Sequence, residues 1–437
     1  MDRRVVVTGI GIVSPIGIGA ADFWSQLLAG TSGVKPISAF DPGGFACRIG
    51  AEVPAFKIAE YVPKTYRKAT KVMARDIELA VVAADLAFKD AGLQSKAYTE
   101  SPDIDVKRFG CNIGAGLISC ELDELTSAMH VARGTGEEGS GKLDLTKWGA
   151  EGMTQLTPLW LLKYLPNMLA CHVTIIHGLM GPSNTITCAD ASSHLAIGEA
   201  FRTISRGKAD LAICGGAESR LNPMGHIRQQ LLGRLNDTAN DDPAEAVRPF
   251  DAAAAGTVVG EGGGLLVLEE YEHAKARGAK IYAELVGFAA SQNANSVTDP
   301  DPTGHSYSKA VANALRDAGV SPAELDLVIP HGLGIASADK AELEGLKKAL
   351  GEDLNRVAFA PIKAQTGNPA AGCGVDAAAA VLAIHSGMIP PSRNTLDTGG
   401  VKLNVSNVAR TRRVRTALSS ASSLGGQNAA LVFRAVE

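Results

Sequence analysis

The chain has 437 residues, of which 46% are hydrophobic and 20% charged, and its formal net charge is −4 at pH 7. This length provides a large core, in two or three domains or in one duplicated domain, and the near-neutral charge excludes a basic surface for nucleic acid. Seven cysteines without CxxC spacing, in a chain with no signal peptide and no membrane-length apolar run, favour reduced thiols in a cytoplasm.

The first half of the chain is predicted to consist of strands that alternate with helices. Apolar, β-branched runs predict buried strands over residues 4–11 and 109–113. Helical periodicity closed by glycine predicts helices over 20–29 and 71–89. Residues 117–165 have weak periodicity, so we expect them to form an insertion on the scaffold and no part of the repeated core.

Two more features of the first half complete this pattern. Residues 31–65 are rich in proline and glycine and are expected to be irregular. Strands are predicted over 209–214 and 265–270, the second of which continues a glycine-rich stretch.

The stretch from residue 181 to residue 207 is the one around which this half is organised. Its sequence predicts a short buried strand, a tight turn of small residues over 188–191 and an amphipathic helix that ends before Gly207. Backbone N–H groups and the macrodipole at a helix N-terminus favour negative charge, and reactive residues are often placed on such turns. Asp190 occupies the turn, so its chemistry decides the function.

The second half repeats the order of elements of the first half. It is predicted to contain strands over 281–288, 327–330 and 359–362 and helices over 308–316 and 375–385. We therefore predict an internally duplicated α/β unit with the halves 1–265 and 266–437, and with the insertion 117–165 in the first copy only. The two strand-to-helix turns are expected to meet at one site.

Several motifs resemble those of the β-ketoacyl-ACP synthases, the elongating condensing enzymes of fatty acid and polyketide synthesis. They are RVVVTGIGIVSPIG, GLMGPS, RPFD, GEG, DKAE and GGQN, which begin at residues 4, 178, 248, 260, 339 and 425. The resemblance runs from residue 3 to residue 433. It implies a thiolase-like fold of two pseudo-duplicated α/β halves in αβαβα layers, usually a dimer, with acyl carrier protein as a partner and with neither a metal nor a cofactor.

The resemblance also implies which residues form the site. Family members use a cysteine on the first turn as acyl acceptor and two histidines of the second half for malonyl decarboxylation, supported by a lysine and a glutamate. Carried over to this chain, the nucleophile position falls on Asp190, the first histidine is His331 and the second falls on Asn368. The lysine is Lys363 and the glutamate is Glu342.

Three further positions would contact the substrate. The threonines that hydrogen-bond the phosphopantetheine arm in the family fall on Leu333 and Ile335. The gating phenylalanine of the C-terminal Gly-Phe-Gly-Gly motif falls on Leu424. Leu333 and Ile335 are apolar, so the arm would lose the hydrogen bonds that the threonines of the family provide.

Claisen condensation by this chain alone is not expected. It requires a nucleophile that is also a leaving group, as a thiolate at a helix N-terminus is. A carboxylate at Asp190 would form a hydrolysable mixed anhydride, and its charge would repel a malonyl carboxylate at roughly 4 Å by several kcal/mol. Asn368 donates a hydrogen bond but cannot titrate, so the acid/base pair is reduced to one histidine.

Each of these residues also has a purely structural interpretation. Asp190 is more simply explained as a helix N-cap than as a chemical group. His331 is either a donor to a thioester carbonyl or an ion-pair partner of Asp190. Lys363 and Glu342 can persist as a buried charge pair, which is costly to break on one side. Cys188, which we place on the strand, is more simply a core residue than a displaced nucleophile.

Three hypotheses of function follow. The first is a non-condensing partner subunit, similar to a chain-length factor, that pairs with a catalytic ketosynthase. The second is an acyl-thioester enzyme of altered chemistry in which Asp190 is the base and His331 the acid. The third is a conventional 3-oxoacyl-ACP synthase that uses Cys188. A homodimer and a heterodimer both stay open, as does a purely structural dimer without ligand.

Overall fold

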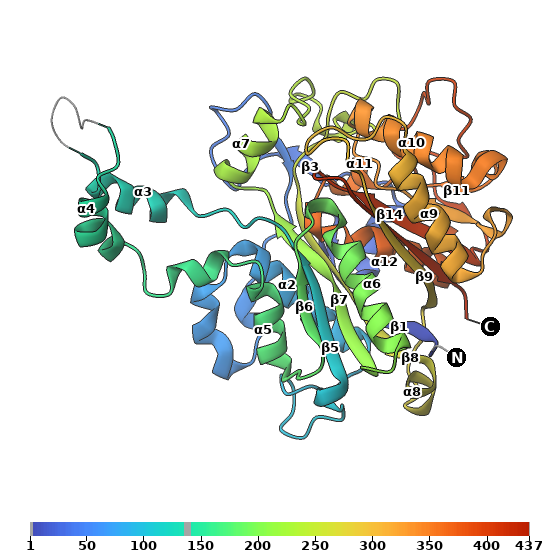
Figure 1. The fold of residues 1–437 in the computed structure, drawn as a ribbon, viewed down its shortest axis with the longest axis horizontal. Helices are drawn as coiled ribbons and strands as arrows, with labels where there is room; N and C mark the ends of the chain where they lie inside the picture. The colour runs from blue at the N-terminus through green and yellow to red at the C-terminus, as the bar shows by residue number, and fades with distance from the viewer. Residues whose placement is uncertain (1–2, 135–140, 437) are drawn as a thin grey trace.

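The computed structural model describes residues 3–134 and 141–436. Within these residues, an 11-stranded sheet runs in the order β11-β10-β14-β15-β9-β1-β8-β7-β5-β6, with β2 paired to the end of β1 (Figure 1). The strands are β1 (Val5–Ser14), β2 (Gly17–Ile18), β5 (Phe109–Ala115), β6 (Ser183–Ile186), β7 (Leu211–Ser219), β8 (Glu261–Glu270), β9 (Ala283–Gln292), β10 (Leu327–Ile329), β11 (Ala358–Phe359), β14 (Thr416–Ser422) and β15 (Gln427–Arg434).

The two halves of this sheet have the same strand pattern. In the first half, β5 is parallel to β6 and β7, and β8 is antiparallel to β7 and β1. In the second half, β10 is parallel to β11 and β14, and β15 is antiparallel to β14 and β9. The halves join where Val5, Val6 and Val7 of β1 pair with β9. The predicted internal duplication of an α/β unit is therefore confirmed.

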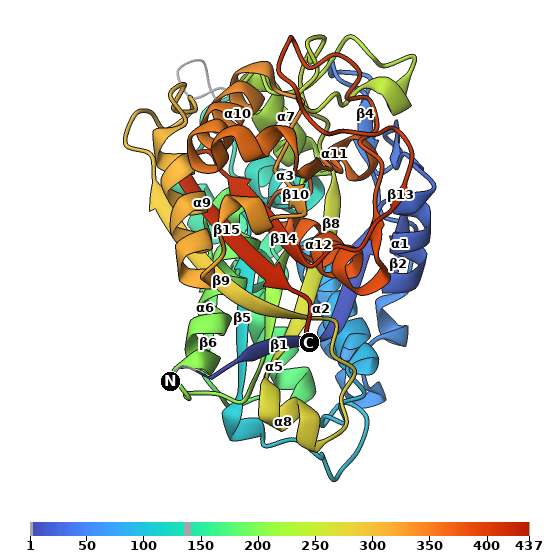
Figure 2. The same cartoon turned by 90° about the vertical axis from the view of Figure 1, so that its right-hand side faces the viewer.

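Helices cover the outer face of each half and fill the space between the halves. On the first half, α2 (Arg75–Asp90) packs on β1 and α5 (Met168–His177) packs on α2. On the second, α9 (His305–Ala318) packs on β9 and α10 (Ala336–Leu350) packs on α9. Between them, α6 (Ser192–Ser205) and α12 (Gly374–Ser386) each contact strands of both halves (Figure 2). The expected αβαβα layering is confirmed.

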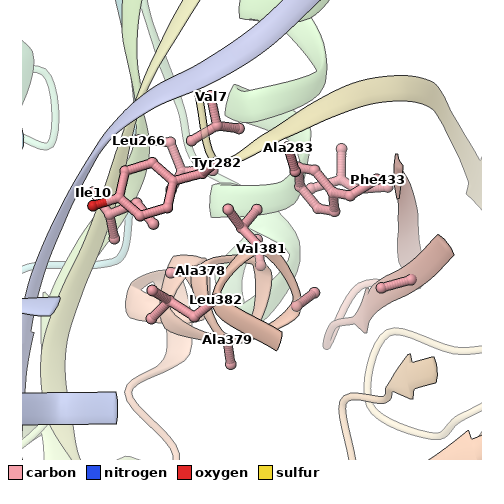
Figure 3. Packing of buried hydrophobic residues seen from close by; sticks show 14 of the residues in the cluster. Val7, Ile10, Leu266, Tyr282, Ala283, Ala378, Ala379, Val381, Leu382 and Phe433 are labelled. Atoms are coloured by element: carbon pink, nitrogen blue, oxygen red, sulfur yellow. The ribbon is translucent and has the colours of Figure 1, made fainter. Parts of the chain in front are cut away.

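The central layer is close-packed because its side chains are small. In Figure 3, Ala378 and Val381 of α12 lie in the same cluster as Val7 and Leu266 of the sheet. A Cβ atom added to Gly264 of β8 would lie 2.3 Å from the backbone of Gly374, so only glycine permits this approach. The alanine-rich sequence of α12 is thus explained by its position between the two halves.

The remaining elements are short and lie around this core. They are α1 (Ala20–Leu28), β3 (Val34–Pro36), β4 (Ile49–Ala51), α3 (Leu122–Val131), α4 (Leu145–Lys147), α7 (Pro223–Leu231), α8 (Tyr271–Ala276), α11 (Lys363–Thr366), β12 (Met388–Ile389) and β13 (Arg410–Thr411). Figure 1 shows α3 and α4, from the segment predicted as an insertion, standing away from the body of the molecule. Among the described helices, none has the length and apolar character needed to cross a membrane.

Three local expectations are wrong. The stretch 31–65 is not wholly irregular, because β3 and β4 form a two-stranded sheet within it. The helix predicted over 71–89 begins at Arg75, since a 3-10 helix occupies Lys64–Val72. The strand before the turn is not buried: β6 is the last strand of the sheet, and its Ser183 and Asn184 are exposed.

Candidate functional site

The two strand-to-helix turns meet between α6 and α12. The first, Ala189–Ala191, precedes α6, and the second, Ala370–Gly372, precedes α12. Ala189 and Ala370 both have left-handed backbones, with φ of 46° and 49°. Such strain is held where the surrounding structure fixes a turn, often at functional sites. The Ser193 hydroxyl donates to the carbonyl oxygen of Ala371 and joins the two turns.

Asp190 lies at this junction and is fully buried. Its Oδ1 accepts a hydrogen bond of 2.8 Å from Nδ2 of Asn368 and lies 3.7 Å from Nε2 of His331. Asn368 is held in turn by the Ala370 amide, which donates to its Oδ1. Three of the predicted site residues are therefore brought together.

The helix-cap interpretation of Asp190 is wrong. At the start of the turn and of α6, no side-chain cap hydrogen bond is formed within the described residues, and the cap positions are held by Cys188 and Ala191. The Asp190 carboxylate points instead to the second half of the molecule. The Ser192 hydroxyl, at the start of α6, accepts from the Cys188 amide and donates to the carbonyl oxygen of Ala189.

Two arginines that the sequence analysis missed surround the carboxylate. Nη2 of Arg220 lies 3.7 Å from Oδ2 of Asp190, and Nε of Arg220 donates to Glu218 at 2.8 Å. Arg234 is also buried, and its charge acts on Asp190 from a greater distance. Two guanidinium groups thus balance the carboxylates of Glu218 and Asp190 inside the protein.

This environment fixes the protonation of the site. Burial opposes the charge of Asp190, but Arg220, Arg234, His331 and the Asn368 hydrogen bond outweigh it and hold the pKa of the carboxyl below its usual range. Burial lowers the pKa of His331 to about 3, despite the opposing effect of Asp190. A carboxylate therefore faces a neutral imidazole at neutral pH. The 3.7 Å separation from Asp190 makes an ion pair only with a protonated His331, a state that burial of the ring disfavours.

Glu342 holds the backbone of the His331 loop. Its two carboxylate oxygens accept from the amides of His331 and Gly332 at 2.8 and 2.9 Å, and Tyr307 donates to it at 2.7 Å. Asp339, one turn earlier on α10, accepts from the next two amides of this loop. The first turns of α10 therefore position His331 through the main chain.

Lys363 pairs with Asp376 and not with Glu342. Nζ of Lys363 donates to Oδ2 of Asp376 on α12, and both side chains have no exposed surface. The predicted Lys363–Glu342 charge pair is therefore wrong, because Glu342 is taken up by the backbone of the neighbouring loop. Burial opposes the charge of Lys363, but Asp376 raises its pKa above the usual value, so the ammonium stays charged.

A pocket of about 370 Å³ reaches one side of this site. Its lining includes His331 together with the three predicted substrate-binding residues Leu333, Ile335 and Leu424. His331 belongs to this lining and Asp190 does not. The three candidate substrate contacts therefore lie together in the described lining of the pocket, and the Asp190 carboxylate is buried outside it.

Cys188 and His194 lie near the turn without taking part in this arrangement. Cys188 follows β6 and is half-buried, and burial raises the pKa of its thiol. The thiol is thus not activated. His194 is fully buried in α6 and bonds to the Ser419 hydroxyl through Nε2 at 2.8 Å, as expected of a packing residue.

Sequence reasoning missed Arg220, Arg234, Asp339 and Asp376. Asp339 could have been found, because it begins the DKAE motif that carries Glu342. Arg220 follows the strand β7 by one residue, which is a common place for functional side chains. Arg234 and Asp376 have no local signal, since only the packing of the two halves brings them to the site.

Comparison with known proteins agrees with this architecture. Residues 2–274 match the family described as Beta-ketoacyl synthase, N-terminal domain, and residues 282–396 match Beta-ketoacyl synthase, C-terminal domain. The chain is 35% identical over 438 residues to 3-oxoacyl-[acyl-carrier-protein] synthase 2 of Vibrio cholerae, covering 99% of each chain.

Two solved structures have the same fold over the whole chain. The ishigamide ketosynthase/chain length factor superposes with a TM-score of 0.84 at 29% identity, covering 100% of both chains. A type II PKS acyl-carrier protein in complex with its ketosynthase bound to the hexaketide gives 0.83 at 28%, again with 100% of both chains covered. The two family matches and the full-length relatives establish that this chain belongs to the β-ketoacyl synthase family, with the family's thiolase-like fold.

Proposed function

We propose that this chain is a non-condensing subunit, similar to a chain-length factor, that pairs with a catalytic ketosynthase of fatty acid or polyketide synthesis. The observation that carries the proposal is the state of Asp190. At the turn where the family is expected to place its nucleophile, the side chain is a fully buried carboxylate bound to Asn368 and outside the pocket. A buried carboxylate that does not line the pocket is poorly placed to accept an acyl chain from a thioester bound there.

The electrostatics weigh against an enzyme of altered chemistry. A general base works best when its pKa lies near the working pH, whereas the pKa of the Asp190 carboxyl is held below its usual range. A general acid must hold a proton, whereas the pKa of His331 is about 3. The assignment of Asp190 as base and His331 as acid is therefore the weaker candidate.

The use of Cys188 as nucleophile is also the weaker candidate. Nucleophilic thiols have a lowered pKa, which cations or a hydrogen-bonded base provide. The pKa of Cys188 is raised by burial, and the residue is not among those that line the pocket.

The surface supports association with a second subunit. The edge strand β6 is partly exposed, and large apolar side chains are exposed on α5, just before β6 and within residues 145–161. Unpaired strand edges and exposed apolar patches favour pairing with another chain. The exposed apolar residues include Leu145, Leu159, Leu161, Ile175 and Met180.

The comparisons support a ketosynthase as the partner. One matched structure is described as a ketosynthase/chain length factor, and another contains an acyl-carrier protein with its ketosynthase. By analogy we infer that a ketosynthase is the pairing subunit. Acyl carrier protein would then bind either to this chain directly or to the ketosynthase subunit.

Co-expression with the ketosynthases of the same pathway tests the proposal. We expect a one-to-one heterodimer by native mass spectrometry, no condensation product from this chain alone, and product from the pair. A pair whose ketosynthase carries a Cys→Ala change at its own nucleophile is the control and should be inactive. A chain that stays a homodimer with every ketosynthase would contradict the proposal, as would condensation by the chain alone.

Asp190→Asn separates the two remaining candidates. If the chain hydrolyses or decarboxylates acyl or malonyl thioesters, and Asp190→Asn abolishes that turnover, the enzyme of altered chemistry replaces our proposal. Covalent labelling of Cys188 by an acyl thioester, detected by mass spectrometry, would favour the conventional synthase.

A further inference from the structure

The two strand-to-helix turns are joined by a network of buried side chains that runs from one half of the molecule to the other and back. Oδ1 of Asp190 accepts from Nδ2 of Asn368 at 2.8 Å, and Oδ1 of Asn368 accepts from the Ala370 amide at 2.9 Å. The next amide, that of Ala371, donates to Oε2 of Glu218 at 2.8 Å. Asp190 and Glu218 belong to the first half of the chain, and the other three residues belong to the second.

Arg220 closes this network. Its Nε donates to Oε1 of Glu218 at 2.8 Å, and its Nη2 lies 3.7 Å from Oδ2 of Asp190. This Oδ2 atom has no hydrogen-bond partner among the described residues, so the charge of Arg220, with that of Arg234 farther away, compensates it. Asp190, Glu218 and Arg220 are 0%, 2% and 9% exposed. At this burial, solvent screens the attraction far less than it does on the surface.

The first half also holds the backbone of the second turn on both sides. Glu218 accepts from the amide of Ala371, and the Ser193 hydroxyl donates to the carbonyl oxygen of the same residue. A Cβ atom added to Gly216 of β7 would lie 2.3 Å from this carbonyl oxygen, so glycine allows β7 to approach the turn closely. The second turn is therefore fixed by groups of the other half.

Each turn contains a strained residue that requires such support. Ala189 and Ala370 have φ of 46° and 49°, in the left-handed region that favours glycine. Residues in this conformation persist only where the surrounding structure holds them. Asp190 follows Ala189 directly, and Asn368 accepts from the amide of Ala370. The network is thus attached to the chain next to one strained residue and directly at the other.

We propose that the network of Asp190, Asn368, Glu218 and Arg220 is a noncovalent cross-link that joins the two halves of the molecule and holds both strained turns. The Asp190 carboxylate is then a conformational element at the turn where the family is expected to place its nucleophile. A cross-link of this kind operates within one chain. It therefore goes beyond the proposed function and does not depend on a partner subunit.

A double-mutant cycle on the full chain tests the cross-link. Asp190→Asn leaves a buried cation uncompensated, and Arg220→Gln leaves a buried carboxylate uncompensated. Each should raise the equilibrium constant of unfolding, measured in urea, by at least about a hundredfold. The two substitutions together restore the balance of charge. The double variant should therefore be at least about tenfold more stable than the product of the single effects predicts.

Arg202 and Asp317 provide the matched control pair. Nη2 of Arg202, on α6, lies 2.7 Å from Oδ2 of Asp317, on α9, so this ion pair also joins the two halves. Its side chains are 29% and 28% exposed, and solvent weakens their attraction. The effects of Arg202→Gln and Asp317→Asn should multiply to within about fivefold. A coupling between Asp190 and Arg220 that is no larger than in this pair would overturn the proposal.

Hydrogen exchange distinguishes a cross-link from a contact that supports only its own turn. Under native conditions, Asp190→Ala should speed exchange at the amides of Ala370 and Ala371, in the other half, by at least about tenfold. Asp317→Ala is the control and should leave these two amides unchanged. Faster exchange in Asp190→Ala that is confined to the first turn would contradict the cross-link.

If the variants of Asp190 do not fold, Asn368→Ser serves instead. It keeps every charge of the network, and its shorter side chain no longer reaches the Asp190 carboxylate. We expect exchange at the amide of Ala191, in the first turn, to be several times faster. An unchanged rate at this amide would contradict the proposal.

Discussion

At the scale of single residues, the site is defined by how its charges are compensated. Asp190, Arg220, Arg234 and Glu218 form a buried set of two carboxylates and two guanidinium groups, with a neutral His331 beside it. Breaking such a set on one side leaves an uncompensated buried charge, which costs about 3–5 kcal/mol. The aspartate at this turn is thus part of a compensated set of buried charges.

The neutral state of His331 predicts a specific pH dependence of stability. Its pKa falls from 6.5 to about 3 on folding, so between these values the unfolded chain binds the extra proton. Stability is therefore lost as pH falls from about 6.5 towards 3, by about 1.4 kcal/mol per pH unit for this residue. His331→Gln should remove this contribution and flatten the dependence by that amount.

Urea unfolding of the wild type and of His331→Gln between pH 4.5 and 6.5 measures the effect. Burial raises the pKa of Asp76 to about 8, which acts in the opposite sense over this range. The difference between the two proteins is therefore the quantity to compare. Parallel curves for wild type and variant, at unchanged m-values, would show that His331 takes up its proton in the folded state as readily as in the unfolded one.

At the scale of elements, α10 fixes the conformation of the loop that carries His331. The carboxylates of Glu342 and Asp339 accept the four consecutive amides of residues 331–334. These hydrogen bonds fix the loop, because its N–H groups would otherwise be buried without a partner. This explains why both acids are buried although neither forms an ion pair with another described residue.

Glu342→Gln tests this role. A glutamine has one carbonyl oxygen where two carboxylate oxygens now accept the amides of His331 and Gly332, so one buried donor loses its partner. We expect a loss of about 1–3 kcal/mol in the free energy of unfolding and faster hydrogen exchange at these two amides. Glu344→Gln, on the same helix but in a partly exposed pair with Lys347, should change stability by less than about 1 kcal/mol. Equal effects of the two substitutions would contradict the role given to Glu342.

Many of the helices and strands could be predicted from the sequence, and those that could not have physical reasons. The strand β1 and the helices α9 and α12 were predicted from the apolar patterns of their sequences, which are clear because these elements are largely buried. The strands β3 and β4 were missed, because three-residue strands in a proline- and glycine-rich stretch carry no periodic signal. The pairing of Lys363 with Asp376 could not be foreseen, since the partner of a buried charge is set by packing.

At the scale of the whole molecule, the duplication and the meeting of the two turns were predictable from the repeated order of elements. The sequence also placed Asp190, His331 and Asn368 at one site through the family resemblance. It could not show that His331 and Arg234 line the pocket and that Asp190 does not. Those facts depend on how the two halves close on each other.

The exposed apolar surface next to β6 predicts where a second subunit binds. Met180, which is 70% exposed, comes shortly before β6, and Leu159, which directly precedes a 3-10 helix that contacts α5, is 67% exposed. A charge introduced at either position would lose its hydration when an apolar interface forms around it, which weakens association. In the isolated chain the same charge stays in water, so the fold is almost unaffected. We therefore expect Met180→Glu combined with Leu159→Glu to weaken association with the partner subunit by at least about tenfold.

The matched control is Leu396→Glu. Leu396 is equally exposed, at 68%, but lies in the second half beyond α12 and outside the surface near β6. Sedimentation velocity over a dilution series gives the association constant, and thermal unfolding checks that each chain is folded. If Leu396→Glu weakens association as much as the double substitution does, a general effect of charge is responsible and the surface near β6 is not the interface. Selective loss with the double substitution would instead show that the surface near β6, with Met180 and Leu159, binds the partner.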